Sequence, residues 1–336
     1  MGSNAFCGEV FTNVHPKVLE AILQVNDRPV EGKVGNDSET KGATEIMQRY
    51  FKDAIRVVYA MNGTAANILA LKSMLPRWGS VLCEENTHIH THECGALESM
   101  LGNKILAVKG NAGKLTPRDI EKYLFKIKNY KYLPSVIVIT QPTELGVLYT
   151  NEEIRAMCDF AHANGMAVYI DGARITNALE ALNTTLTEMI EKTDVDAFSF
   201  GGTKAGAMFG EMVVFRRKEH MTALDYLQKQ ALQHLDKSKF LGVQMKVLLE
   251  TELWHETASH ANAMARYLAK KLDEKGIVPC YPVDTNVVFC VLNENALGKI
   301  NQKYNAKFWD PENGIVRFVT TFVTDAREID DLVSFL

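Results

Sequence analysis

Three short polar segments of this sequence each follow an apolar run that is typical of a β-strand. Asp171 comes directly after the run AVYI, and Lys204 follows the run AFSF across a Gly-Gly-Thr turn. The third segment, residues 62–64 (NGT), leaves the run RVVYA and opens a helical pattern. Because the C-terminal ends of parallel strands converge at one edge of a sheet, we expect these segments to meet in one crevice.

Each segment carries a group with its own chemistry. Gly63 and Thr64, at a helix N-terminus, offer backbone N–H groups and a hydroxyl to a phosphate. A buried carboxylate such as that of Asp171 can keep a pyridine nitrogen protonated. Lys204, on a glycine-rich turn, can form a Schiff base if burial and nearby cations lower its pKa. Any one of these features is more often a cap or a solvated turn, but their combination at strand ends is far rarer by chance.

The elements that must position these groups alternate in type between about residues 55 and 215. Helices with clear start signals, such as Thr116-Pro117 and the capping box at residues 150–153, separate the apolar runs. Most of the runs are continuous rather than alternating, as in strands buried on both faces. They lie at residues 56–60, 81–85, 104–108, 136–140, 167–170, 197–200 and 212–215. This order predicts a three-layer α/β sandwich around a mostly parallel, seven-stranded sheet.

The pattern changes near residue 240. Residues 239–275 are predicted to form one long helix that ends in lysines and Gly276, a residue suited to a left-handed stop. Two further strands are predicted, at residues 287–292 and 315–322, each followed by a helix. We therefore expect an N-terminal segment and large domain over residues 1–240, and the long helix with a smaller C-terminal α/β domain over residues 241–336.

Composition limits the classes of partner and compartment. The 336 residues are 46% hydrophobic and carry a net charge of −4, with no cluster of basic residues, which argues against nucleic acid and membrane as partners. No apolar run approaches the ~20 residues that span a bilayer, and we expect no secretory signal. The six cysteines are scattered, which is typical of reduced thiols in a cytoplasmic enzyme.

The sequence resembles the threonine aldolase and β-eliminating lyase family of pyridoxal-phosphate (PLP) enzymes, which have the aspartate-aminotransferase fold (fold type I). The resemblance covers nearly the whole chain. It is carried by NGTAAN (62–67), ENTHIHTHECGA (85–96), DGARITNAL (171–179), SFGGTK (199–204) and VRFVTTF (316–322). It implies a PLP-dependent carbon–carbon lyase that cleaves the Cα–Cβ bond of a β-hydroxy amino acid. L-Threonine or L-allo-threonine would give glycine and acetaldehyde.

The resemblance implies a role in cofactor binding for several residues. Lys204 would form the Schiff base, and Asp171 would pair with the pyridine nitrogen. Gly63 and Thr64 would hold the phosphate, and His88 would lie against the face of the ring. Lys204, Asp171 and His88 are the expected catalytic residues.

The resemblance also implies how the substrate is held. Arg174 would reach the phenolic oxygen of the ring or the substrate carboxylate, and Glu93 would lie close by. Arg317 would bind the carboxylate, since a guanidinium fits two oxygens at once. In this family neighbouring subunits complete each site, so a homodimer or homotetramer is implied. The basic segment 229–239 could reach the partner's phosphate or be a solvated helix face.

Two positions depart from the family pattern. Many threonine aldolases have a histidine where this sequence has Thr143, which leaves His88, His92 or an ordered water as the general base. Many relatives also begin with a Ser-Asp-Asn segment that helps to bind the substrate carboxylate. Residues 8–10 are Gly-Glu-Val instead, so we expect an altered pocket.

Three other interpretations remain open. A PLP enzyme could catalyse β-elimination or transamination of another small amino acid. Second, the protein could bind an amino acid as a sensor without turnover. A pure sensor has no need of a Schiff-base lysine, which argues against this interpretation. A zinc enzyme could use His88, His90 and His92, which would align on an extended segment, although we expect no metal site.

Overall fold

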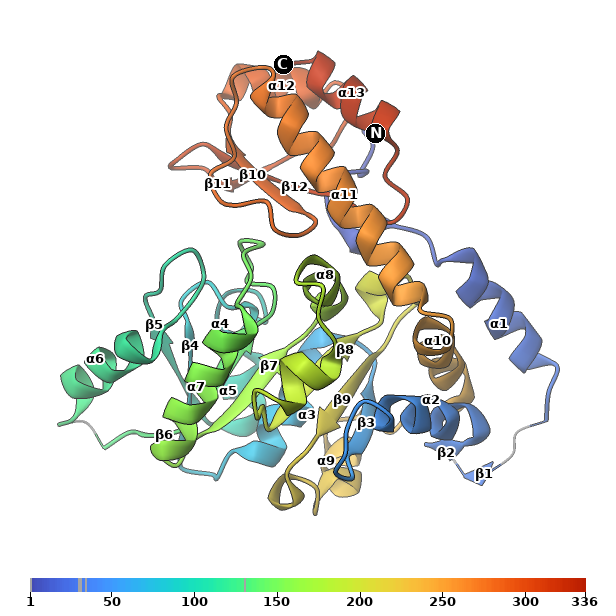
Figure 1. Ribbon diagram of the computed structural model, residues 1–336, viewed down its shortest axis with the longest axis vertical. Helices are drawn as coiled ribbons and strands as arrows, with labels where there is room; N and C mark the ends of the chain where they lie inside the picture. The colour runs from blue at the N-terminus through green and yellow to red at the C-terminus, as the bar shows by residue number, and fades with distance from the viewer. Residues whose placement is uncertain (1, 30–31, 34, 130) are drawn as a thin grey trace.

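The protein is described by a computed structural model that covers residues 2–29, 32–33, 35–129 and 131–336. Its centre is a seven-stranded sheet with the order β3-β9-β8-β7-β6-β4-β5 (Figure 1). The strands are β3 (Arg56–Ala60), β4 (Gly79–Glu84), β5 (Lys104–Val108), β6 (Leu133–Thr140), β7 (Ala167–Asp171), β8 (Ala197–Gly201) and β9 (Glu211–Phe215). All neighbouring pairs are parallel except those of β9, which runs antiparallel to β3 and β8. The predicted mostly parallel sheet is confirmed.

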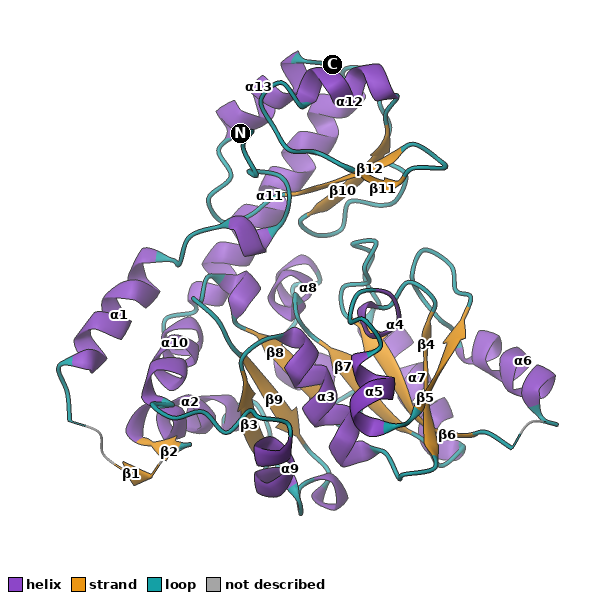
Figure 2. Ribbon diagram, turned by 180° about the vertical axis from the view of Figure 1, so that it is seen from behind, coloured by secondary structure: helices purple, strands orange, loops and turns teal. Residues whose placement is uncertain are grey.

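Helices cover both faces of this sheet, and they make the three layers. Alternate residues of each strand point to opposite faces, so Tyr169 and Val213 pack on one side while Ile170 and Val214 pack on the other. The first side carries α3 (Gly63–Met74), α5 (Ala96–Leu101) and α9 (Leu224–Gln230), which lie in front of the sheet in Figure 2. The second side carries α2 (Ser38–Gln48), α6 (Pro117–Ile127), α7 (Asn151–Ala163), α8 (Ile175–Ala181) and α10 (Lys239–Glu250).

Local signals fix where several helices begin. Thr116 and Asp119 form a capping box at the start of α6, and Thr150 and Glu153 form another at the start of α7. Each cap satisfies backbone N–H groups that the helix itself leaves without a partner, which stabilises the helix by about 1 kcal/mol. The predicted start signals therefore act as expected.

The prediction of one long helix over residues 239–275 is wrong. The segment forms α10 and α11 (Leu253–Asp273), separated at Glu252, whose φ of +52° is left-handed and cannot continue a helix. The reason is packing: α10 lies against α1 (Pro16–Asn26) and α2, whereas α11 contacts α8 and α13 (Ala326–Ser334). Gly276, with a φ of +75°, ends α11 as predicted.

A small antiparallel sheet with the order β10-β12-β11 forms the second body. Its strands are β10 (Val287–Val291), β11 (Phe308–Asp310) and β12 (Ile315–Val319), and α11, α12 (Glu294–Ile300) and α13 pack on it. The first residues of the chain belong to its core, because Phe6 is buried against Tyr304 and Phe318. Both chain termini therefore lie at this body (Figure 1).

The remaining elements are short. They are the hairpin of β1 (Gly32–Lys33) and β2 (Asn36–Asp37), the helical turn α4 (His88–Thr91), the π-helical turn η2 (Thr187–Glu191), and the 3-10 turns η1 (Glu9–Phe11), η3 (Thr203–Ala205) and η4 (Lys218–His220). Within the described ranges, none of the helices has both the length and the apolar character needed to cross a bilayer.

Candidate active site

The C-terminal edge of the large sheet brings the three predicted polar segments together. Asp171 is the last residue of β7, Lys204 lies on η3 directly after β8, and α3 begins at Gly63 after β3. Strands β7 and β8 are adjacent and parallel, and Asp171 and Lys204 are close enough for the charge of each to act on the other.

The start of α3 is open on the side where a phosphate could bind. The side chain of Asn62 accepts a hydrogen bond from the N–H of Ala65 (2.9 Å), which caps the helix. The first N–H groups, those of Gly63 and Thr64, have no partner within the helix. A Cβ atom on Gly63 would meet no described atom within 4 Å, so the surroundings of this residue are open, and the N–H groups of a helix start are suited to an anion.

Asn67 connects the carboxylates at the centre of the site. Its Nδ2 donates to Oδ2 of Asp171 (3.0 Å) and to Oε1 of Glu93 (2.7 Å), while Tyr169 donates its hydroxyl to the Asn67 Oδ1 (2.9 Å). Burial raises the pKa of Asp171, and the Asn67 hydrogen bond and the charge of Lys204 oppose that rise. Asn67 was not singled out from the sequence, although it ends the motif NGTAAN.

His88 and Glu93 form a second pair beside this network. Nδ1 of His88 lies 2.8 Å from Oε1 of Glu93. Burial alone would lower the pKa of His88, but its hydrogen bond to the Glu93 carboxylate and the charges of Glu144 and Asp171 raise it overall. The other oxygen of Glu93, Oε2, is buried and has no hydrogen-bond partner among the described residues.

The alternating histidines do not lie on an extended segment. Residues 88–91 form the helical turn α4, so His90 is exposed while the rings of His88 and His92 stack at 5.5 Å. The alignment of three imidazoles that a zinc site would need is therefore absent, and the described ranges hold no cluster of three or more His, Cys, Asp or Glu side chains suited to a metal ion.

A column of planar groups crosses from the large sheet to the small one. It consists of His88, His92, Trp309 and Arg317, and we call it the stacked column. His92 stacks on Trp309 at 5.2 Å, and Cζ of Arg317 lies 4.4 Å from the centroid of a Trp309 ring. Trp309 was missed from the sequence because its three-residue strand β11 was not predicted.

Arg174 already has a carboxylate partner. Its Nε donates to Oε1 of Glu9 (2.6 Å) and its Nη2 donates to Oε2 (2.9 Å), and both side chains are almost fully buried. Asn286 donates its Nδ2 to the same Oε1 (2.7 Å). Burial would raise the pKa of Glu9, but the Arg174 guanidinium lowers it to about 2. The departure noted at residues 8–10 thus supplies a buried anion.

Lys204 is placed for nucleophilic chemistry. Burial and the charge of Arg174 lower its pKa, and the carboxylate of Glu9 opposes them. The turn before it requires glycine, because a Cβ atom on Gly201 would lie 2.3 Å from the carbonyl oxygen of Ala173.

Glu211 is a further titratable group at this edge that was missed from the sequence. It is the first residue of β9 and pairs in register with Ala60 and Gly201. Its Oε2 is buried with no hydrogen-bond partner among the described residues, and burial raises its pKa to about 8, with Thr203 and Lys204 opposing that rise. The sequence carried no signal for it, because a Glu at a strand start is usually solvated.

The hydroxyl of Thr143 has a structural role. It accepts a hydrogen bond from the N–H of Val147 (3.2 Å) and donates to the carbonyl oxygen of Ala112 (3.4 Å). Thr143 is buried, and these bonds close the loop after β6. A threonine hydroxyl held in this way is no replacement for a histidine base.

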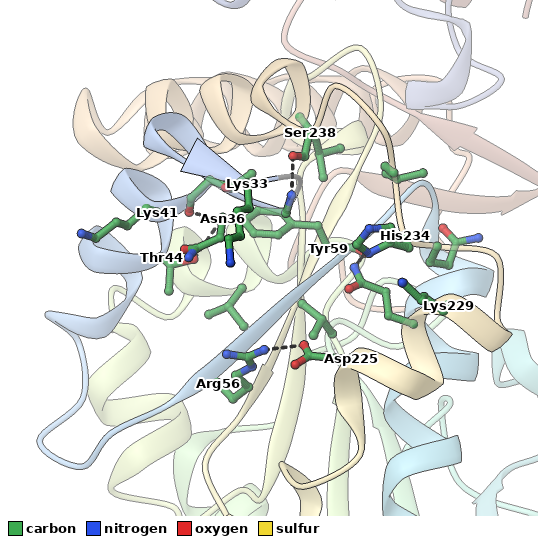
Figure 3. Close-up of a pocket in the computed structure, with 18 of the residues that line it drawn as sticks. Lys33, Asn36, Lys41, Thr44, Arg56, Tyr59, Asp225, Lys229, His234 and Ser238 are labelled. Atoms are coloured by element: carbon green, nitrogen blue, oxygen red, sulfur yellow. Dashed lines mark hydrogen bonds and ion pairs between the residues drawn. The ribbon is translucent and has the colours of Figure 1, made fainter. Parts of the chain in front are cut away.

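The basic segment 229–239 touches the turn that leads into α3, because Oε1 of Gln233 accepts a hydrogen bond from the N–H of Met61 (3.0 Å), but its charged side chains have other surroundings. Lys239 is buried and donates to the carbonyl oxygens of Val25 and Arg28. Lys229 and His234 line a separate cavity of about 670 Å³ beside the edge strand β3, which Figure 3 shows in close-up. That cavity contains none of the predicted site residues.

The groups at the sheet edge fit PLP. A phosphate matches the helix N-terminus at Gly63 and Thr64, and a pyridine nitrogen matches the buried carboxylate of Asp171. An aldehyde matches the amine of Lys204, whose pKa is lowered. The buried oxygens of Glu93 and Glu211 that lack partners lie among these groups, as expected where a polar ligand completes a site.

Comparison with other proteins places the chain among known enzymes. The sequence model of a family described as "Beta-eliminating lyase" matches residues 16–295. The chain is similar to the low specificity L-threonine aldolase of a Pseudomonas species, with 33% identity over 99% of this chain and 96% of that protein. It is also similar to the enzyme of the same name from Saccharomyces cerevisiae, with 25% identity over 91% of this chain and 79% of that protein.

Solved structures agree with the sequence relatives. The chain superposes on Leishmania major threonine aldolase with a TM-score of 0.92 and 29% identity, covering 97% of this chain and 96% of the other. A putative L-allo-threonine aldolase from Listeria monocytogenes has a TM-score of 0.76 at 17% identity, over 99% of this chain and 93% of the other, which shows a shared fold.

Proposed function

Since this chain belongs to the β-eliminating lyase family, whose members depend on PLP, we propose that it cleaves L-threonine or L-allo-threonine to glycine and acetaldehyde. The membership confirms the family that the five motifs predict. The observation that carries the proposal is the convergence of Lys204, Asp171 and the start of α3 at one sheet edge, in a chain similar along its whole length to aldolases.

We assign the cofactor contacts as follows. Gly63 and Thr64 hold the phosphate, Asp171 holds the pyridine nitrogen, and His88 lies against the ring face. The amine of Lys204 would hold the aldehyde carbon of PLP. When bound, PLP supplies an electron sink next to Cα of the substrate.

The substrate carboxylate is assigned to the guanidinium of Arg317, assisted by the Arg174 donors that Glu9 leaves free. Two fixed contacts to the carboxylate orient the rest of the amino acid, including the Cα–Cβ bond that breaks. Glu93 is assigned an indirect role, in which its carboxylate fixes Nδ1 of His88.

We assign the general base to His88. Glu93 occupies its Nδ1, which leaves Nε2 to take the proton of the β-hydroxyl. His92 is a weaker candidate, because burial lowers its pKa and its ring is stacked between His88 and Trp309. Loss of that proton forms the aldehyde carbonyl as the Cα–Cβ bond breaks, and Cα then takes a proton, so threonine yields only glycine and acetaldehyde.

We also propose that the enzyme works in the cytoplasm as a homodimer or homotetramer, with an amino acid as its substrate and no nucleic acid or membrane partner. In this proposal the contact between subunits lies beside the edge strand β3, where Lys229 and His234 are exposed. All six cysteines are free thiols, which suits a reducing compartment. Light scattering of the purified protein measures the number of subunits.

The test follows the visible absorbance of the PLP-loaded protein while glycine and then L-threonine are added, with acetaldehyde measured in the same sample. We expect a visible band that shifts with glycine, and aldehyde from threonine. A shift with no aldehyde, but with a keto acid product, would replace aldol cleavage by β-elimination or transamination.

The matched variants for this test are Lys204→Ala and Lys303→Ala. Lys204→Ala is expected to fold, to lose the visible band and to lose aldehyde release by a factor of 10³ or more, roughly the loss seen when a covalent catalytic group is removed. Lys303 pairs with Asp331 on the surface, so its variant should behave as the wild type. Aldehyde release by Lys204→Ala at the wild-type rate would refute the assignment.

A further inference from the structure

Glu9 lies where an arginine of the proposed active site presents its best carboxylate-binding edge. It meets Nε and Nη2 of Arg174 with both of its oxygens, at 2.6 and 2.9 Å. The side chain of Glu9 is 4% exposed and that of Arg174 is 12% exposed. A two-pronged contact of this kind is the geometry by which an arginine holds a carboxylate most firmly.

Glu9 is itself held from a second direction. Asn286, at the end of the loop that leads into β10, donates Nδ2 to Oε1 of Glu9 at 2.7 Å and to the carbonyl oxygen of Thr320. Glu9 therefore joins three separate parts of the chain, namely the N-terminal segment, the loop after β7 that carries Arg174, and the small sheet. A carboxylate fixed on both sides can set the orientation of the guanidinium.

The two arginines of the site differ in charge balance. Arg174 is neutralised by Glu9, which lowers its attraction for another anion. Arg317 has no carboxylate within ion-pair distance in the ranges that the structure covers, and its guanidinium lies over the face of Trp309. The free positive charge for a substrate carboxylate is thus that of Arg317.

We propose that Glu9 is a positioning residue, which fixes the orientation of Arg174 so that its remaining N–H donors and the guanidinium of Arg317 together bind the carboxylate of the amino acid. The inference rests on the proposed function for its ligand. In this proposal the Gly-Glu-Val segment helps to form the carboxylate site through Arg174 and does not contact the carboxylate itself.

The experiment compares two amines that differ only in the carboxylate. Glycine and methylamine are titrated separately into the PLP-loaded protein, and the dissociation constant of each is read from the shift of the visible band. In Glu9→Gln and Glu9→Asp we expect glycine to bind about three- to tenfold more weakly, the factor that corresponds to leaving one long side chain mobile. Methylamine should bind within about twofold of wild type, because it makes no use of Arg174.

Two controls keep the result interpretable. Glu256→Gln removes a surface ion pair with Lys17, which also ties the N-terminal region to α11, and should leave both constants unchanged. Glu9→Asp keeps the charge and shortens the side chain, so it decides the matter if Glu9→Gln does not fold or load PLP.

Three outcomes would overturn the proposal. Equal weakening of glycine and methylamine would make Glu9 a purely structural residue, and unchanged glycine binding would remove it from the site. Tighter glycine binding would mean that Glu9 competes with the substrate for Arg174. None of these depends on aldehyde release, so failure of the aldolase assignment is seen separately as a wild-type protein that binds glycine without cleaving threonine.

Discussion

Asn67 shows how much of this site depends on one neutral side chain. It donates to two buried carboxylates, those of Asp171 and Glu93, and has its own oxygen fixed by Tyr169. Two carboxylates this close repel each other unless a donor lies between them. The Asn67 hydrogen bond thus opposes the rise in the pKa of Asp171 that burial causes.

We expect Asn67→Ala to raise the pKa of Asp171 further and to weaken PLP binding by about tenfold or more, since one pKa unit corresponds to about 1.4 kcal/mol. Spectrophotometric titration of the protein with PLP measures this. Asn103→Ala is the matched control, because Asn103 is also buried but donates to the carbonyl oxygens of Pro76 and Gly79. It should lose stability and keep its PLP affinity, and equal loss of affinity in both variants would argue against the role of Asn67.

The individual residues predicted from the sequence share a simple property. Lys204, Asp171 and Gly63 each stand next to a strand that is visible as an apolar run, so their meeting at one edge could be inferred. This reasoning could not reach the roles of Glu9, Trp309 and Glu211, because each role depends on a neighbour far away in the chain.

At the scale of elements, continuous apolar runs gave all seven strands of the large sheet, since strands covered on both faces must be apolar throughout. The three-residue strand β11 is too short to show a period, and it was missed. The break between α10 and α11 falls at Glu252, a good helix former with no glycine or proline to mark it, and only packing against α1, α2 and α8 explains it.

The left-handed backbone at Glu252 leads to a prediction about stability. Glu252 is exposed with a φ of +52°, so Glu252→Gly should relieve backbone strain and stabilise the fold by roughly 0.5–1 kcal/mol. Chemical unfolding of the PLP-loaded protein measures it. Glu250→Gly, at the last residue of α10, should be destabilising, by up to about 1 kcal/mol. If Glu252→Gly were destabilising by a similar amount, the two helices would be continuous in solution.

At the scale of the whole molecule, the site lies between two bodies with separate cores. The stacked column and the bonds of Glu9 both run from the large sheet to the small one, so the relative position of the bodies sets the geometry around Lys204. The division into residues 1–240 and 241–336 stays a prediction, and the burial of Phe6 in the C-terminal core shows that the N-terminal residues pack with the second body.

Glu211 links the site to the pH dependence of the whole fold. Its pKa is raised by burial from an ordinary 4.5 to about 8, so the folded state binds the proton more tightly than the unfolded state. The stability that this group contributes is fully present below about pH 4.5 and is lost as the pH rises towards about 8, with a slope of at most about 1.4 kcal/mol per pH unit.

We expect Glu211→Gln to flatten this part of the profile, measured as the free energy of unfolding between pH 5 and 9 with and without PLP. Glu45→Gln, on the surface beside Lys41, serves as the control and should keep the wild-type slope. A Glu211→Gln profile as steep as that of the wild type would mean that Glu211 is ionised across this range.

The packing of both chain ends into one body also bears on how the protein is made. Ser3 exchanges backbone hydrogen bonds with Lys303 and Asn305, and the carbonyl of Phe6 accepts from the N–H of Val319. These partners leave the ribosome about 300 residues later, on the order of 15–60 s at ordinary rates of synthesis. Until then the first residues lack their packing partners and Glu9 lacks Asn286, so the nascent chain cannot assemble the complete site before residues 286–319 have been synthesised.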